Sequence, residues 1–247
     1  MTHQFQNQRV LVTGGSAGIG KAAATAFADE GADVIIVNRS HDSGTAAVAE
    51  ITDRGGQAEF HSADLTSSEA ISELVVATGP VDVLVTSAGY RPIPGPAADT
   101  SEDDLDATWA VNVKAPWLLS AAYGPMMAQR RSGAIVHVSS VSGTLDQEGF
   151  GAYNVSKAAL NGLVRAFARE LGPTGVRVNA VAPGPTYTPY TEQFGSALDE
   201  LMRPYPLGHP ATADQVAAAI IFLAGSTASH ITGAVLPVDG GQGTVIR

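Results

Sequence analysis

The stretch RVLVTGGSAGIG at residues 9–20 joins an apolar segment, a glycine-rich turn and the start of a helical pattern. Gly14, Gly18 and Gly20 allow a tight turn and a close approach of the backbone to a ligand, and free N–H groups at a helix start attract a pyrophosphate. A phosphate loop of the NTPase kind ends in Gly-Lys-Ser/Thr, whereas this one ends in Gly-Lys-Ala. The stretch therefore predicts a dinucleotide site and disfavours ATP.

Outward from this stretch, short runs rich in Val, Ile and Leu alternate with segments of helical periodicity. The predicted strands lie at 9–14, 33–38, 57–61, 81–86, 134–139, 176–181 and 234–239, and we expect them to be buried on both faces. The predicted helices lie at 18–30, 43–54, 67–78, 102–130 with a break, 152–171 and 213–224. Such alternation specifies βαβ units of one hand. We predict an α/β fold, a doubly wound (Rossmann) parallel sheet of about seven strands with helices on both faces.

No change of composition and no long Ser/Pro linker divides the chain, so we expect a single domain over 1–247. Residues 183–210 are dense in proline and aromatic residues, and we expect them to form a substrate-loop excursion over the sheet edge. Ligands of a doubly wound sheet bind beyond the carboxyl ends of its strands. The unusual residues at those ends are Gly14, Asn38, Asp64, Ser87, Ser140 and Pro183.

Composition excludes several classes of function. A net charge of -10 without a basic stripe excludes a nucleic-acid partner. The chain has no cysteine, which excludes thiolate chemistry and fits a reducing compartment, and its 6 histidines show no metal-binding spacing, so we expect no metal. No apolar run is long enough for a membrane span, and MTHQFQNQ at the start is too polar and short for a signal peptide. We expect a cytoplasmic protein, with His137 packed in its strand rather than catalytic.

Tyr153 and Lys157 stand four residues apart in AYNVSK, so a helix aims both side chains at one place. Free tyrosine titrates near pH ~10, and a close ammonium favours the phenolate. Such a pair suits a general acid or base at neutral pH.

The second predicted strand ends in Val-Asn-Arg-Ser at 37–40, with no carboxylate. An acidic residue here would bind the ribose 2′-OH of NAD, whereas an arginine offers a guanidinium to the 2′-phosphate of NADP. Arg39 therefore favours NADP(H), with NAD(H) as the alternative.

With these residues assembled, the chain resembles the short-chain dehydrogenase/reductase superfamily, in its single-domain form and essentially end to end. The glycine turn resembles the glycine motif of that family. Further similarities are Asp64 in SADLT, TSAG at 86–89, Asn112 in AVNV, Ser140 thirteen residues before Tyr153, Pro183-Gly184 with Thr188, and VDGG at 238–241. Ser87 replaces an asparagine usual in the family, and Ala17 stands where many NADP-dependent members have a basic residue.

The resemblance implies four catalytic residues, Asn112, Ser140, Tyr153 and Lys157. Tyr153 would exchange a proton with the carbonyl or alcohol oxygen, and Ser140 would hydrogen-bond the same oxygen. Lys157 would assist Tyr153 and hold the nicotinamide ribose, while Asn112 would place a water between Lys157 and solvent. Ser139 is the adjacent competitor of Ser140, but neighbouring strand residues face opposite ways and the spacing favours Ser140.

The cofactor-binding residues so implied lie along the whole carboxyl edge of the predicted sheet. They are Gly14, Ser16, Ala17, Gly18, Ile19, Gly20, Asn38, Arg39, Ser40, Asp64, Leu65, Ser87, Ala88, Gly89, Tyr153, Lys157, Pro183, Gly184, Thr186 and Thr188. The predicted substrate site contains Tyr90, Arg91, Leu145, Asp146, Gln147, Phe150, Tyr187, Tyr190, Phe194 and Met202. This mixture suggests a moderately apolar small molecule with one polar handle.

We therefore predict an NAD(P)(H)-dependent oxidoreductase that transfers hydride between nicotinamide C4 and a carbonyl or secondary alcohol. The first alternative is a 3-oxoacyl-acyl-carrier-protein reductase, whose acidic carrier would dock on Arg130, Arg131 and Arg169. The second is a non-catalytic NADP(H)-binding regulator, which is disfavoured because all four catalytic positions are present. By resemblance, helices 102–130 and 152–171 would pack against their copies in a homotetramer or homodimer.

Overall fold

Seven parallel strands form the central sheet of the computed structural model, in the order β3-β2-β1-β4-β5-β6-β9. They are β1 (Arg9–Thr13), β2 (Asp33–Asn38), β3 (Gln57–Ser62), β4 (Val83–Thr86), β5 (Gly133–Val138), β6 (Val176–Pro183) and β9 (Val235–Val238). The structure describes residues 3–244, and the ends of the predicted domain, 1–2 and 245–247, lie outside the described residues. The doubly wound parallel sheet predicted from the sequence is confirmed.

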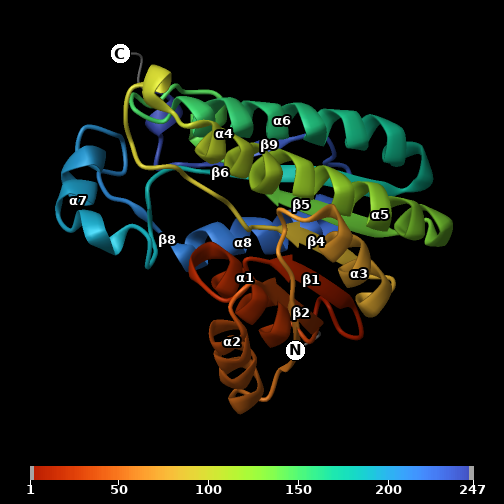
Figure 1. The fold of residues 1–247 in the computed structure, drawn as a ribbon. Helices are drawn as coiled ribbons and strands as arrows, with labels where there is room; N and C mark the ends of the chain where they lie inside the picture. The colour runs from red at the N-terminus through yellow and green to blue at the C-terminus, as the bar shows by residue number, and fades with distance from the viewer. Residues whose placement is uncertain (1–2, 245–247) are drawn as a thin grey trace.

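Helices cover both faces of this sheet (Figure 1). They are α1 (Gly18–Asp29), α2 (His41–Asp53), α3 (Ser68–Thr78), α4 (Glu102–Trp109), α5 (Ala115–Arg130), α6 (Gly151–Leu171), α7 (Ala197–Met202) and α8 (Ala213–Ala224). The apolar faces of α1, α2 and α8 pack on one side, and those of α3, α5 and α6 pack on the other. Within residues 3–244, no helix combines the length and apolar character that crossing a membrane requires.

Strand β1 shows how the sequence divides its side chains between the two layers. Val10 and Val12 belong to the core on the α1 and α8 side, and Leu11 belongs to the core on the α5 and α6 side. Successive strand residues face opposite ways, so a strand in the middle of the sheet is apolar at every position. The expectation of burial on both faces is wrong for the two edge strands, β3 with exposed Gln57 and Glu59 and β9 with exposed Pro237. An edge strand has a neighbour on one side alone and can therefore carry polar residues.

The predicted break in 102–130 is a single π-helical turn, Ala110–Lys114, that joins α4 to α5 without interrupting the helix. Asn112 is buried within this wider turn. A π-turn of this kind often marks a functional site.

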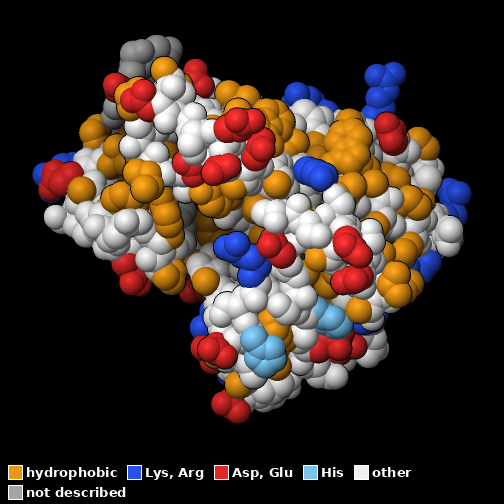
Figure 2. Space-filling model, viewed as in Figure 1, with side chains coloured by type: hydrophobic (Ala, Val, Ile, Leu, Met, Phe, Trp, Pro, Cys, Tyr) orange, Lys and Arg blue, Asp and Glu red, His pale blue; other side chains and the backbone are white. Residues whose placement is uncertain are grey.

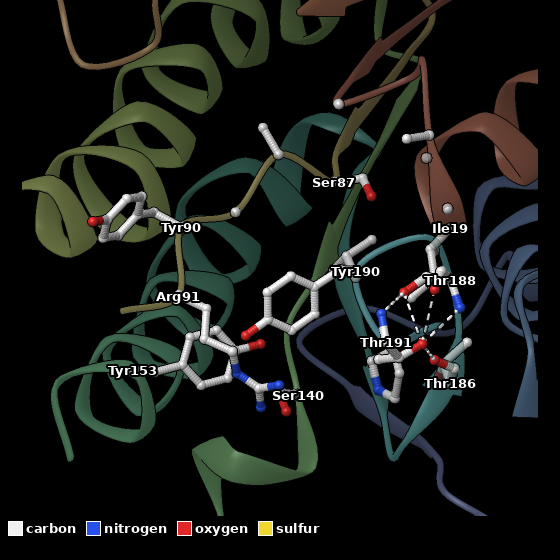
Figure 3. A pocket seen from close by; sticks show the side chains of 18 of the residues that line it. Ile19, Ser87, Tyr90, Arg91, Ser140, Tyr153, Thr186, Thr188, Tyr190 and Thr191 are labelled. Carbon is white, nitrogen blue, oxygen red and sulfur yellow. Dashed lines mark hydrogen bonds between the residues drawn. The ribbon is translucent and has the colours of Figure 1, made fainter. Parts of the chain in front are cut away.

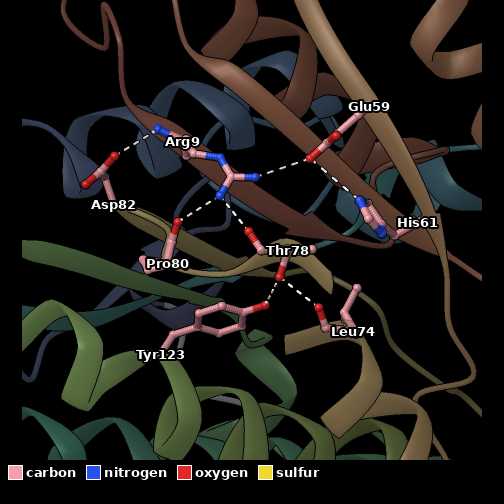
Figure 4. Close-up of polar contacts among 8 residues, drawn as sticks. All are labelled: Arg9, Glu59, His61, Leu74, Thr78, Pro80, Asp82 and Tyr123. Atoms are coloured by element: carbon pink, nitrogen blue, oxygen red, sulfur yellow. Dashed lines mark hydrogen bonds and ion pairs between the residues drawn. The ribbon is translucent and has the colours of Figure 1, made fainter. Parts of the chain in front are cut away.

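A polar network fastens α3 to the sheet at the end opposite the glycine turn (Figure 4). The Arg9 guanidinium donates to the carbonyl oxygens of Thr78 and Pro80 and pairs with Glu59 at 3.3 Å. The Thr78 hydroxyl lies 2.6 Å from the hydroxyl of buried Tyr123. The carbonyl of Thr78, the last residue of α3, thereby gains a donor, as the end of a helix requires.

The excursion after β6 is more ordered than its composition indicates. Strand β7 (Thr186–Tyr187) pairs in parallel with β8 (Ala211–Thr212), and α7 lies between them in sequence. This two-stranded sheet closes the base of residues 183–210, so the segment between its strands projects as one loop beside the carboxyl ends of the large sheet (Figure 1).

Candidate active site

A cleft of about 920 Å³ lies along the carboxyl ends of the strands. Strands β1 and β4 are neighbours at the middle of the sheet, and the chain runs outward from them in both directions, which is where ligands bind in doubly wound folds. The surface view shows a hollow between the α7 segment and the body of the protein (Figure 2). All of the residues predicted to bind cofactor line this cleft except Ser40.

The glycine turn forms the floor of the cleft beneath the start of α1. Gly14 has a φ of +68°, and a Cβ on it would lie 2.8 Å from the backbone nitrogen of Ala88. A Cβ on Gly20 would lie 2.2 Å from the carbonyl oxygen of Gly14. Among the described residues no side chain caps α1, whose N-cap residue is Ala17. The first N–H groups of the helix therefore remain for an anionic ligand, and the cradle fits a pyrophosphate.

The residues after β2 and β3 lie at one end of the cleft. The Asn38 amide nitrogen donates to the Ser40 carbonyl at 2.8 Å, while its Oδ1 is buried without a hydrogen-bond partner among the described residues. Asp64 accepts from the backbone and hydroxyl of Thr66, and these bonds lower the pKa of its carboxyl. Arg39 is exposed at the rim and contributes to that lowering. Ser40 instead caps α2, accepting from the Ser43 N–H.

Tyr153 and Lys157 lie one turn apart on α6, where both line the cleft. Lys157 is 4% exposed, and its Nζ donates to the Val138 carbonyl at 2.8 Å and lies 5.5 Å from the centre of the Tyr153 ring. Burial lowers the pKa of the Lys157 ammonium, Tyr153 opposes that effect, and the like charge of Arg91 adds to it. The helix thus holds a buried ammonium beside the phenol, as the spacing predicts.

Ser140 and Ser139 differ in direction, as adjacent residues at a strand end should. The Ser139 hydroxyl donates to Asn161 Oδ1 at 2.6 Å on α6. The Ser140 hydroxyl oxygen accepts from the Ser142 N–H at 3.1 Å, and Ser140 lines the cleft together with Tyr153. Ser140 is therefore the better placed of the two to bind a group held by Tyr153.

Asn112 is fully buried and does not line the cleft. Its Oδ1 accepts from the Tyr90 N–H and its Nδ2 donates to the Tyr90 carbonyl, both at 2.8 Å. The same Nδ2 also donates to the Ser156 hydroxyl at 3.0 Å on α6. Asn112 thus ties the loop after β4 to the helix that carries Tyr153 and Lys157.

The opposite end of the cleft is lined by six of the residues expected at the substrate site, Tyr90, Arg91, Gln147, Phe150, Tyr190 and Phe194. Leu145, Asp146, Tyr187 and Met202, also expected there, do not line it. Thr191 lines it without having been expected: its hydroxyl donates to the Thr186 carbonyl and accepts from the Thr188 N–H, both at 2.8 Å. The pattern TYTPYT at 186–191 was the available signal for this turn.

His137 lies outside the cleft and is completely buried on β5. Its Nδ1 is 2.7 Å from the hydroxyl of Thr86, and its Nε2 has no hydrogen-bond partner among the described residues. Burial, and then the charge of Lys157, lowers the pKa of His137 to about 3. The imidazole is neutral at physiological pH and is packed in its strand, as expected.

Comparison with known proteins matches residues 14–242 to a family model described as enoyl-(acyl carrier protein) reductase. Cyclopentanol dehydrogenase of Comamonas is 36% identical over 239 residues, covering 94% of this chain and 95% of that protein. A 3-oxoacyl-[acyl-carrier-protein] reductase of Thermotoga maritima is 36% identical over 243 residues, covering 96% and 98%.

Solved structures share the fold as well. A 3-oxoacyl (acyl-carrier-protein) reductase from Agrobacterium tumefaciens, with NADP bound, is 29% identical with a TM-score of 0.91. The similarity covers 97% of this chain and 96% of that one. The similarity to these proteins, in sequence and in fold, therefore extends over nearly the whole length of this chain.

Proposed function

This chain belongs to the short-chain dehydrogenase/reductase superfamily and is an NAD(P)-dependent oxidoreductase of carbonyls and alcohols, and from that premise we propose that it prefers NADP(H) and uses Tyr153 as its general acid and base. The observation that carries this proposal is the convergence of Ser140, Tyr153 and Lys157 in one cleft with the glycine turn. A fold by itself does not define an activity, whereas this group of side chains suits proton transfer beside a nicotinamide.

A bound nicotinamide supplies or accepts a hydride at C4. In the reducing direction, Tyr153 donates its phenolic proton to the substrate oxygen as the carbonyl becomes an alcohol. Ser140 holds that oxygen by a hydrogen bond during the same step. In the oxidising direction Tyr153 recovers the proton.

Lys157 supports this transfer from the wall of the cleft, and Asn112 supports it from behind that wall. The buried Lys157 ammonium stabilises the phenolate that remains after Tyr153 has given up its proton. Asn112 acts as a positioning residue, because its bonds to Tyr90 and Ser156 fix the loop after β4 against α6. By the family resemblance, Asn112 would also place a water between Lys157 and solvent.

The cofactor preference rests on the end of β2. The sequence there contains no carboxylate to bind a ribose 2′-OH, and Arg39 is exposed at the rim of the cleft. A guanidinium in that place suits a 2′-phosphate. The glycine turn, Asn38, Asp64 and the segment 183–188 would hold the rest of the dinucleotide.

The chain is 36% identical to a 3-oxoacyl-[acyl-carrier-protein] reductase, which favours reduction of a carrier-bound ketone as the second candidate. Carrier docking would need free cations. Arg131 and Arg169 are exposed, but Arg130 is engaged, since it donates to the Val81 carbonyl at 2.6 Å and pairs with Asp82 at 3.4 Å. A small free substrate therefore remains the first candidate. A regulator without catalysis is the least favoured, because Ser140, Tyr153 and Lys157 are all in place.

We also propose a homotetramer or homodimer in the cytoplasm. Trp109 is 38% exposed and Trp117 is 50% exposed on α4 and α5. Hydrophobic side chains gather over these helices beside the acidic first turn of α4 (Figure 2). Exposed aromatic residues of this kind mark subunit contacts. The lack of cysteine fits a reducing compartment.

The proposal is tested by steady-state assays of a panel of ketones and secondary alcohols with NADPH, NADH and their oxidised forms. We expect turnover with at least one combination of substrate and nucleotide, and a higher kcat/KM with NADP(H) than with NAD(H). Turnover with a strong preference for NADH would refute the argument from Arg39. Binding of nucleotide without turnover of any member of the panel would favour the regulator.

A further inference from the structure

Arg91 extends from the loop after β4 into the cleft, directly beside Tyr153 (Figure 3). Its guanidinium carbon lies 4.3 Å from the centre of the Phe150 ring and 4.5 Å from the centre of the Tyr153 ring. The Tyr190 ring is the next aromatic neighbour, at 5.9 Å. Rings stacked on the face of a guanidinium hold it in place while its edge keeps its N–H donors.

The hydrogen bonds of Arg91 are incomplete. A guanidinium carries five N–H donors and has no acceptor. Arg91 Nη2 donates to Gln147 Oε1 at 3.2 Å, whereas its Nε is buried without a partner among the described residues. An unpaired buried donor is costly, so such a group stands out in a native protein.

Among the described residues, no acidic side chain forms an ion pair with Arg91. The charged residues lining the cleft are Arg39, Asp64, Arg91 and Lys157, and the two nearest Tyr153 are both cations. This positive end is notable in a chain with 24 acidic and 14 basic residues.

We propose that Arg91 binds an oxyanion of the substrate, a carboxylate or a phosphate carried close to the reacting carbon. The inference rests on the function proposed above and narrows its substrate class to short-chain oxo acids, or oxo phosphates, and their hydroxy counterparts. A guanidinium edge accepts two oxygens of such a group in one plane. Because the same guanidinium stacks on Tyr153, an anion bound to it places the neighbouring carbonyl near the phenol.

Two matched pairs of ketones test the proposal. The first is acetoacetate and its neutral methyl ester, and the second is dihydroxyacetone phosphate and dihydroxyacetone. The kcat/KM of each is measured with wild-type protein, Arg91→Gln, Arg91→Lys and the control Arg165→Gln, whose exposed side chain lies on α6 away from the cleft.

We expect wild-type protein to prefer the anionic member of at least one pair by about tenfold or more, the size of a charged hydrogen bond. Arg91→Gln should remove that preference mainly through KM, Arg91→Lys should keep part of it, and Arg165→Gln should keep all of it. A preference in the first pair identifies a carboxylate, and one in the second pair identifies a phosphate.

Two results would overturn the inference: a wild-type enzyme that reduces the neutral members as well as the anionic ones, or a preference that survives Arg91→Gln. Cyclopentanone serves as a further neutral ketone that separates this failure from failure of the proposed function. Reduction of neutral ketones alone leaves the proposed function intact and removes the inference. Reduction of no ketone, while NADPH still binds, removes both.

Discussion

Acidification should destabilise this protein through His137, which lies completely buried between its neighbours in the middle of the sheet. Its pKa of about 3 in the folded chain compares with 6.5 for an ordinary histidine. Between these values the unfolded chain binds the additional proton, so the free energy of unfolding falls as the pH falls. The stability that the neutral, buried His137 contributes is fully present above pH ~6.5 and is lost progressively as the pH falls toward ~3.

The size of the effect follows from the same two values. A pH of ~5 is about 1.5 units below the pKa of the histidine in the unfolded chain. Each unit changes the free energy of unfolding by about 1.4 kcal/mol. His137 should therefore lower the free energy of unfolding by about 2 kcal/mol between pH ~7 and pH ~5.

Urea unfolding at the two pH values measures this loss in wild-type protein and in a double variant, Thr86→Val with His137→Leu. The double variant replaces both partners of a buried hydrogen bond with apolar groups, which avoids leaving the Thr86 hydroxyl unpaired. Other titrating groups contribute to both proteins, so the difference between them isolates His137. An equal loss in the two proteins would refute the reasoning.

Two further predictions concern the cofactor. Gly20→Ala should abolish NADPH binding in a fluorescence titration, because its Cβ would lie 2.2 Å from the Gly14 carbonyl oxygen. The control Gly172→Ala, whose Cβ would meet nothing within 4 Å, should bind NADPH normally. Normal binding by both variants would contradict the role of the glycine turn in binding the cofactor. Arg39→Asp should reduce the ratio of kcat/KM for NADPH over NADH by about tenfold or more, and an unchanged ratio would show that Arg39 does not contact the 2′-phosphate.

The sequence predicted the main elements of the fold because each carries its own periodicity. The run DVIIVN became β2 over Asp33–Asn38, and the spacing of Leu160, Leu163 and Val164 became the buried face of α6. The pair Thr186–Tyr187 of β7 could not be predicted, since two residues hold no pattern and depend on Ala211 and Thr212 to form a strand. The exposure of β3 likewise depends on its place at the edge of the sheet.

The site was predictable where its chemistry follows from local spacing. The prediction that Tyr153 and Lys157 lie together required only one turn of helix. The prediction of the glycine turn required only the strand before it and the helix after it. Thr191 was missed because its partners Thr186 and Thr188 meet it only through the shape of a loop. The contacts of Asn112 with Tyr90 and Ser156 also arise from tertiary packing, 22 and 44 residues away in sequence.

The most direct test of the account is the kcat of Tyr153→Phe, measured with any carbonyl substrate found in the panel and paired with an NADPH titration. The phenylalanine keeps the ring that stacks on Arg91 and removes only the hydroxyl that transfers the proton. We predict a fall in kcat of about 10² to 10⁴, as for other general acids, with a dissociation constant for NADPH that changes by less than about threefold. A kcat close to that of the wild-type protein would contradict the central claim.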